Sequence, residues 1–99
     1  MKRVVVTGMG VLTPIGNNVE AYNHGLSGAA TITQFDASLF KAQFACEIKN
    51  FAPESVIDKK EIRRLDKYTQ FALVAAHEAM VMSGLDVEKI DLDRAGIIY

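Results

Sequence analysis

The run at residues 2–16, KRVVVTGMGVLTPIG, constrains the fold more than any other part of the chain. Residues 4–6 are three valines that leave no polar face, which is typical of a strand covered on both sides of a parallel sheet. Gly8, Gly10 and Pro14 then end the strand pattern. We therefore predict a buried core strand followed by a loop at one end of a sheet.

A strand that is followed by Gly8-x-Gly10 also begins a dinucleotide-binding fingerprint. That fingerprint needs a further Gly or Ala at position 13, where a helix N-terminus meets the pyrophosphate. Thr13 occupies the position, and Pro14 disfavours helical backbone at Thr13. A structural turn is favoured, and a non-catalytic nucleotide-binding α/β module that uses this turn is the alternative.

Three short helices have recognisable start signals. Asn17 or Asn18 can cap the first, and Pro53 suits the first turn of the second. Asp58, with Glu61 three residues later, has the spacing of a capping box and predicts the start of the third.

The longest predicted helix covers residues 66–83, with Gly84 in the position of a C-terminal cap. Its apolar residues fall on roughly one side. They are Tyr68, Phe71, Ala72, Ala75, Ala76, Ala79 and Met82. We expect the four alanines to let another helix or a sheet approach this helix closely.

Two more strands are predicted, one at the alternating residues 44–49 and one at the apolar residues 95–99. The side chains expected to face the core from the first of them are Phe44, Cys46 and Ile48. Residues 29–34 have no clear period and are predicted to be a loop. The order of elements points to an α/β fold with some parallel pairing, in one domain without an internal boundary at residues 1–99.

The composition predicts an incomplete core. Hydrophobic residues make up 49% of the 99 residues, which is more than so small a domain can easily bury. We therefore expect a fragment, or a subunit that completes its core with another chain. The net charge of −1 argues against a general nucleic-acid or membrane surface, and no 18-residue apolar stretch is present. The single Cys46 cannot form an internal disulfide, which fits a cytoplasmic protein.

The residues suited to catalysis or metal binding are few. The zinc-protease pattern that starts at His77 has Val81 where the second His is required, so we predict no metal site. Cys46 is interpreted as an inert core thiol because its predicted neighbours are apolar. Spacing alone leaves open a dyad of Cys46 with His24 or His77.

A cluster of positive charge is more informative. Lys60, Arg63, Arg64 and Lys67 have the i, i+3, i+4 and i+7 spacing of one helical stripe. One interpretation is a solvated helix face that nearby carboxylates neutralise. The other is a docking surface for an acidic partner, where such charges steer the encounter.

Several segments, taken in order, resemble a known family. They are VVVTGMGVLTPIGN, FDAS, KKEIRRLDKYTQFALVAAHEAM, and SGLD followed by AGIIY. Together they are similar to the N-terminal part of the β-ketoacyl-[acyl-carrier-protein] synthases. The run R-R-x-D-x-x-x-Q-[FY] at residues 63–71 most resembles the type II condensing enzymes of fatty acid synthesis. The resemblance covers essentially the whole chain.

This resemblance implies the N-terminal part of a thiolase-like, five-layered α-β-α-β-α fold, incomplete in this chain. It also implies a cytoplasmic homodimer that elongates acyl chains by decarboxylative condensation with malonyl-carrier protein. Acyl carrier protein is the implied partner, and its phosphopantetheine brings the substrates, so no further cofactor is expected. The family's nucleophilic Cys and its His residues lie downstream, and Cys46 does not match the nucleophile's motif. Residues 1–99 alone should therefore be inactive.

The resemblance also assigns the positive cluster. Positions that match Lys60, Arg63 and Arg64 line the approach of the carrier protein in the family. Lys67 is left out, because Asp66 can start a new helix and break the stripe. A standalone docking protein that uses these residues without catalysis is a third possibility.

Overall fold

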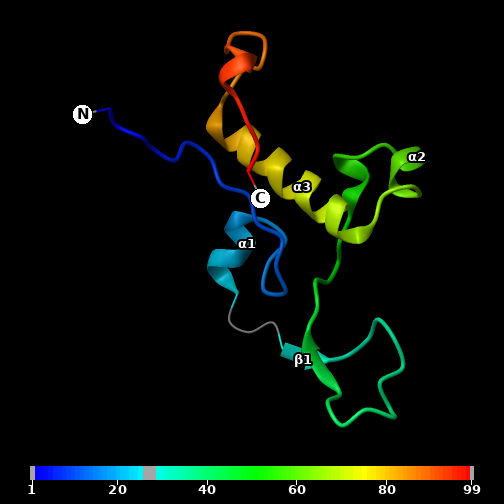
Figure 1. Cartoon of the computed structure of the whole chain (residues 1–99). Coiled ribbons are helices and arrows are strands. Elements are labelled where there is room, and N and C mark those ends of the chain that lie inside the picture. The colour runs from blue at the N-terminus through cyan, green and yellow to red at the C-terminus, as the bar shows by residue number, and fades with distance from the viewer. Residues whose placement is uncertain (1, 26–28, 99) are drawn as a thin grey trace.

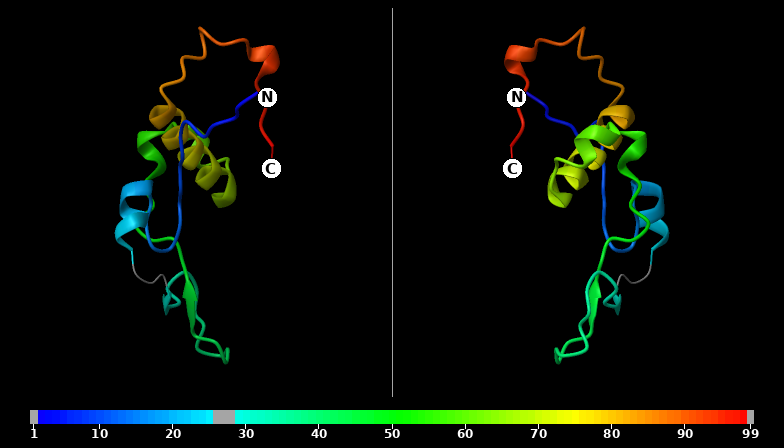
Figure 2. Two further views of the ribbon diagram at one scale, coloured as in Figure 1. Left: turned by 90° about the vertical axis from the view of Figure 1, so that its left-hand side faces the viewer. Right: turned by 90° about the vertical axis from the view of Figure 1, so that its right-hand side faces the viewer.

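The computed structural model describes residues 2–25 and 29–98, and it has an open, elongated shape (Figure 1). Its elements in order are α1 (Val19–His24), β1 (Ala29–Thr31), β2 (Phe44–Cys46), the 3-10 turn η1 (Pro53–Ser55), α2 (Lys59–Ile62), α3 (Lys67–Ser83) and the 3-10 turn η2 (Leu92–Arg94). The principal extents are 54 × 35 × 21 Å, and the Cα radius of gyration is 16.9 Å. A compact chain of this length has a radius near 13 Å. Figure 2 shows the β1–β2 arm projecting away from the helices.

Helix α3 is the main scaffold, and the N-terminal segment packs against its backbone. A Cβ atom on Gly8 would overlap with the carbonyl oxygen of Ala79, and one on Gly10 would overlap with that of Ala75. Two residues of extended chain advance about 6.7 Å. Four residues of helix advance about 6 Å, so the two glycines meet two alanines one turn apart. An extended segment, and not the helix or sheet that was predicted, therefore approaches α3 closely at two of the four alanines.

The predicted helix starts and ends are largely confirmed. Asn18 is the N-cap of α1 and Asp58 that of α2, each with its side chain accepting a backbone N–H. Asp66 is the N-cap of α3, and Gly84 ends that helix in the left-handed region, with φ 68° and ψ 14°. Pro53 begins η1, which has the tighter 3-10 geometry. These signals are local in sequence, so they hold without a complete core.

The prediction of buried strands at both ends of the chain is wrong for this structure. Residues 4–6 and 95–98 form no strand, and Tyr99 lies outside the described residues. Val4 is 93% exposed and Ile98 is 98% exposed. A strand needs a hydrogen-bonded neighbour, and the only ladder among the described residues joins β1 to β2.

The arm between residues 29 and 46 also differs from expectation. β1 lies where a loop was predicted, and it pairs with β2 in antiparallel register, with Ala30 opposite Ala45. Parallel pairing is therefore not found in the described part of the chain. Phe44 and Cys46 are exposed rather than facing a core, because the ladder has only three residue pairs and nothing described covers that face.

The described residues form very little core, as the composition predicts. The buried residues are Ala37, Pro53, Ile57 and Gln70. Most large apolar side chains of the N- and C-terminal segments are exposed. Among the helices of the described part, none has the length and apolarity that crossing a bilayer requires.

Candidate functional site

Four cationic side chains gather around one surface hollow of about 350 Å³ beside α2. They are Lys59, Lys60, Arg63 and Arg64, and we call them the basic patch. The Asp58 carboxylate accepts a hydrogen bond from the backbone N–H of Lys60 at 3.3 Å and so starts the helix. Arg63 ends it with helical backbone angles. The structure therefore brings together the three predicted site residues, Lys60, Arg63 and Arg64, and adds Lys59.

The basic patch is fixed to α3 by a buried amide. Gln70 is 3% exposed, and its Nε2 donates hydrogen bonds to the carbonyl oxygens of Ile62 at 3.0 Å and Leu65 at 2.9 Å. Ile62 is the last residue of α2, and Leu65 lies in the turn that follows it. Gln70 Oε1 is buried without a hydrogen-bond partner. One side chain of α3 therefore sets the position of the short α2 helix.

Lys67 does not belong to the basic patch. Asp66 starts α3 as a separate helix, which confirms that the positive stripe breaks there. The Lys67 Nζ atom lies 5.6 Å from the ring centroid of Phe51, in cation–π range. Phe51 in turn meets Phe71 edge to face, with 4.9 Å between ring centroids. Lys67 is thus directed toward this aromatic pair.

One carboxylate pairs with a member of the basic patch. The Arg64 guanidinium lies 3.9 Å from Glu61 Oε1 in an exposed i, i+3 pair. Glu61 therefore does not reach back to the N-terminus of α2 as the second half of a capping box would. Charge on the basic patch is partly compensated at Arg64.

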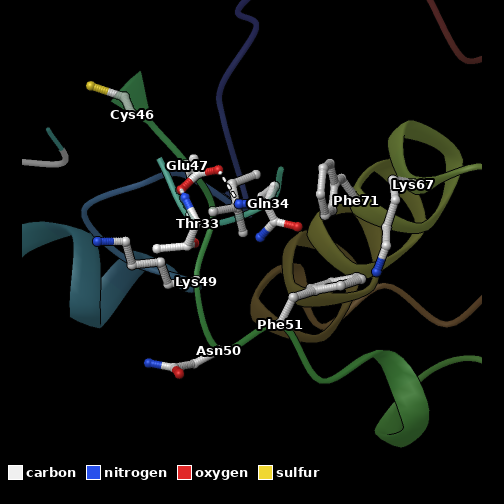
Figure 3. A pocket seen from close by; sticks show the side chains of 10 residues that line it. Thr33, Gln34, Cys46, Glu47, Lys49, Asn50, Phe51, Lys67 and Phe71 are labelled. Carbon is white, nitrogen blue, oxygen red and sulfur yellow. Dashed lines mark hydrogen bonds between the residues drawn. The ribbon is translucent and has the colours of Figure 1, made fainter. Parts of the chain in front are cut away.

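A larger hollow of about 780 Å³ lies between the β1–β2 arm and the start of α3 (Figure 3). The Glu47 carboxylate shapes one wall by accepting hydrogen bonds from the backbone N–H groups of Thr33 at 2.9 Å and Gln34 at 3.1 Å, and from the Thr33 hydroxyl. The Thr33 N–H is the main cause of a lowered pKa for Glu47, because it stabilises the ionised form. Phe51 and Phe71 form the apolar wall.

The residues that line this larger hollow do not form a recognisable set of catalytic residues. Cys46 lines it as an exposed thiol, so the interpretation of Cys46 as a core residue is wrong. Neither His24 nor His77 lines the same hollow, and both are exposed. The dyad that spacing left open is therefore not assembled. Within the described ranges, no group of three or more His, Cys, Asp or Glu residues could hold a metal ion.

The nucleotide-binding alternative is not supported. The backbone N–H groups of Val11 and Val19, which follow the Gly8-x-Gly10 turn, both donate to the carboxylate of Glu78, at 2.9 Å each. Val19 is the first residue of α1, so the protein's own anion occupies the position that a phosphate would need. Gly8 and Gly10 serve the close contact with α3 instead.

The sequence did not predict the roles of three residues, of which two shape the basic patch and one holds the N-terminal loop on α3. Lys59 is not among the predicted site residues, although it lines the same hollow. Gln70 stands in the R-R-x-D-x-x-x-Q run, which carries part of the family resemblance but does not indicate what the side chain of Gln70 does. Glu78 gave no signal, because its two donors lie 67 and 59 residues away in sequence.

Comparison with known proteins gives a consistent result. The family model described as "Beta-ketoacyl synthase, N-terminal domain" matches residues 1–99. A 3-oxoacyl-[acyl-carrier-protein] synthase 2 of Staphylococcus aureus (strain COL) is 47% identical over 100 residues, which cover 97% of this chain and 24% of that protein. The protein of the same name from Coxiella burnetii is 43% identical, with the same coverage.

A solved structure, the ishigamide ketosynthase/chain length factor, superposes with a TM-score of 0.80 at 36% sequence identity. The match covers 90% of this chain and 23% of that one. The chain thus spans about a quarter of the length of the relatives that it matches.

Proposed function

This chain belongs to the β-ketoacyl synthase family, as its N-terminal domain, and on that premise we propose that the complete protein is a 3-oxoacyl-[acyl-carrier-protein] synthase of type II. The predicted fold, the N-terminal part of a thiolase-like α/β fold, is confirmed by the shared fold with a ketosynthase. The proposed activity is elongation of fatty acyl chains. It is supported by relatives of that name along nearly the whole chain.

The proposed reaction has two steps. An acyl group passes from the carrier protein's thiol to an enzyme cysteine, which forms one thioester as another breaks. Malonyl-carrier protein then loses CO₂, and the carbanion attacks the acyl-enzyme to give 3-oxoacyl-carrier protein and the free cysteine. We place the cysteine and its histidines outside residues 1–99, because Cys46, His24 and His77 are not brought together here. Residues 1–99 alone should form no product.

The role that we propose for this domain is to dock acyl carrier protein through Lys60, Arg63 and Arg64. The observation that carries the proposal is the hollow beside α2, whose lining consists only of cationic side chains. Clustered charges of one sign raise the rate of encounter with an oppositely charged partner. The buried hydrogen bonds of Gln70 support the proposal further, because they hold these charges in a fixed place.

The proposal also includes assembly and location. We expect a cytoplasmic homodimer without a bound cofactor, because the carrier protein delivers the substrates. We also expect residues 4–6 to pair with a strand from elsewhere in the complete protein. The exposed valines at these positions support that expectation, since a longer chain offers neighbours that this segment lacks.

The test is carrier-protein binding by the complete protein with Lys60→Glu and Arg63→Glu. We expect binding at low ionic strength to weaken about tenfold or more and to depend less on salt. The matched control carries Lys41→Glu and Lys89→Glu, which make the same charge change at exposed positions outside the basic patch. Unchanged binding by the first variant would contradict the docking role. Binding without condensation by the unaltered complete protein would favour a docking protein instead.

A further inference from the structure

A carboxylate beside the basic patch competes with acidic partners for one of the patch residues. Arg64 and Glu61 form an ion pair of 3.9 Å, and their side chains are 78% and 52% exposed. Both groups therefore remain accessible to an approaching protein. An acidic partner that uses Arg64 must share or replace the carboxylate of Glu61.

The other carboxylates near the patch are placed differently. Asp58 accepts the backbone N–H of Lys60, so its charge serves the start of α2. Asp66 stands at the N-terminus of α3, after the turn that leaves the basic patch. Among the ion pairs of the described residues, only the pair of Glu61 with Arg64 involves a member of the patch.

We propose that Glu61 is a specificity-determining residue of the docking surface, a carboxylate that lowers the affinity for acidic partners. This inference rests on the proposed docking function. The Glu61 carboxylate competes for Arg64 and repels each partner carboxylate that comes near the basic patch, so its penalty grows with the number of those carboxylates. Glu61 therefore limits how much more tightly a strongly acidic partner binds than a weakly acidic one.

The expected size of the effect follows from the exposure of the pair. A unit charge about 10 Å from a partner carboxylate in water changes the binding constant about twofold. Removing the charge with Glu61→Gln should therefore speed association with acyl carrier protein about two- to threefold at low salt, and the gain should vanish at high salt. Dissociation should change little, because charges at an exposed rim act mainly on the encounter.

The experiment measures association of the complete protein with holo-acyl carrier protein, at low and at high salt. Glu88→Gln is the matched control, because it removes the same charge from an exposed position beyond the far end of α3. Helix α3 has 17 residues and is about 25 Å long, so a charge at Glu88 is screened from the patch at about 0.1 M salt, where the Debye length is about 10 Å. Arg64→Gln, alone and combined with Glu61→Gln, completes a double-mutant cycle.

The inference predicts faster association for Glu61→Gln, no change for Glu88→Gln, and a larger loss from Arg64→Gln when Glu61 is already neutral. It also predicts a smaller relative gain for a carrier protein in which several acidic residues have been made neutral. Equal rates for Glu61→Gln and the unaltered protein would overturn it. Slower association would overturn it too, because Glu61 would then help docking by orienting Arg64. Failure of Lys60→Glu with Arg63→Glu to weaken binding is a different result, which removes the docking function itself.

Discussion

Glu78 Oε1 accepts a hydrogen bond from the backbone N–H of Val11 at 2.9 Å, and this bond joins residues 67 positions apart. The second oxygen of the same carboxylate accepts the N–H of Val19, also at 2.9 Å. A carboxylate can accept at both oxygens, whereas an amide offers only one acceptor oxygen. Glu78 therefore fixes the loop between Val11 and Val19 on α3 from both of its ends.

Replacing Glu78 should loosen this loop. With Glu78→Gln, the amide NH₂ group faces an N–H donor, so one of the two hydrogen bonds is lost. Glu78→Ala loses both. Because hydrogen bonds to a charged group contribute about 1.5–3 kcal/mol, we expect local destabilisation of about 2 kcal/mol for Gln and more for Ala. Amide hydrogen exchange of the loop in the complete protein measures the effect. Exchange as slow as in the unaltered protein would show that the hydrogen bonds of Glu78 do not hold the loop in place.

Gly10→Ala should disturb the contact between the N-terminal segment and α3. The added Cβ would overlap with the carbonyl oxygen of Ala75, which is backbone and cannot turn aside. Overpacking of this kind typically costs about 1–3 kcal/mol. Gly96→Ala is the matched control, because a Cβ at Gly96 meets nothing within 4 Å. Thermal unfolding should separate the two variants, and equal midpoints would contradict the close contact.

The features that the sequence predicts correctly are those that neighbouring residues determine. The side chains of Asn18 and Asp58 accept backbone N–H groups within three residues, and the Asp66 carbonyl accepts the N–H of Gln70, four residues on. Gly84 ends α3 in a conformation that glycine favours. The break between Arg64 and Lys67 follows from the same local chemistry. These signals place the basic patch, the main part of the candidate site, on α2 and the turn that follows it.

The features that the sequence did not predict depend on distant residues. The valines at residues 4–6 have strong strand propensity, but no described segment pairs with them, so they are exposed. Cys46 lies in a segment whose apolar and polar residues alternate as in a half-buried strand. No described segment covers its face of the β1–β2 ladder, so the side chain is exposed. Glu78 and Gln70 take their roles from partners across the fold, and a single sequence does not show such pairs. Strand propensity shows that a segment can form a strand, but tertiary contacts determine whether the strand forms.

The arm around Glu47 should respond to acid. Hydrogen bonds from the Thr33 backbone N–H, then the Gln34 N–H and the Thr33 hydroxyl, lower the pKa of Glu47 in the folded protein. The ionised carboxylate therefore stabilises the arm at pH values above the ordinary value of about 4.3. This stabilisation is lost as the pH falls through the lowered pKa.

The Thr33 and Gln34 amides should report this titration. We expect their NMR shifts and their protection from exchange to change only below the ordinary carboxyl value of about 4.3, as the pH falls through the lowered pKa of Glu47. Glu47→Gln should abolish that change, and Glu88→Gln should preserve it. Amides that behave the same at pH 6 and at pH 2.5 would contradict the assigned hydrogen bonds.

Gln70→Glu should displace the basic patch from α3. The new carboxylate would face the carbonyl oxygens of Ile62 and Leu65, which accept hydrogen bonds from the Gln70 amide. Because a buried charge without donors replaces two satisfied hydrogen bonds, we expect a loss of about 3 kcal/mol or more. Carrier-protein binding should weaken as well, since α2 loses its fixed position.

Gln43→Glu is the control for this substitution. Gln43 Nε2 also donates to two carbonyl oxygens, those of Ser38 and Phe40 at 3.3 Å each, but the residue is exposed. Water can solvate the new charge there, so we expect a change below about 1 kcal/mol and unaltered binding. If both variants bind the carrier protein like the unaltered protein, Gln70 does not position the basic patch. If both lose binding equally, the added negative charge, rather than the position of α2, is responsible.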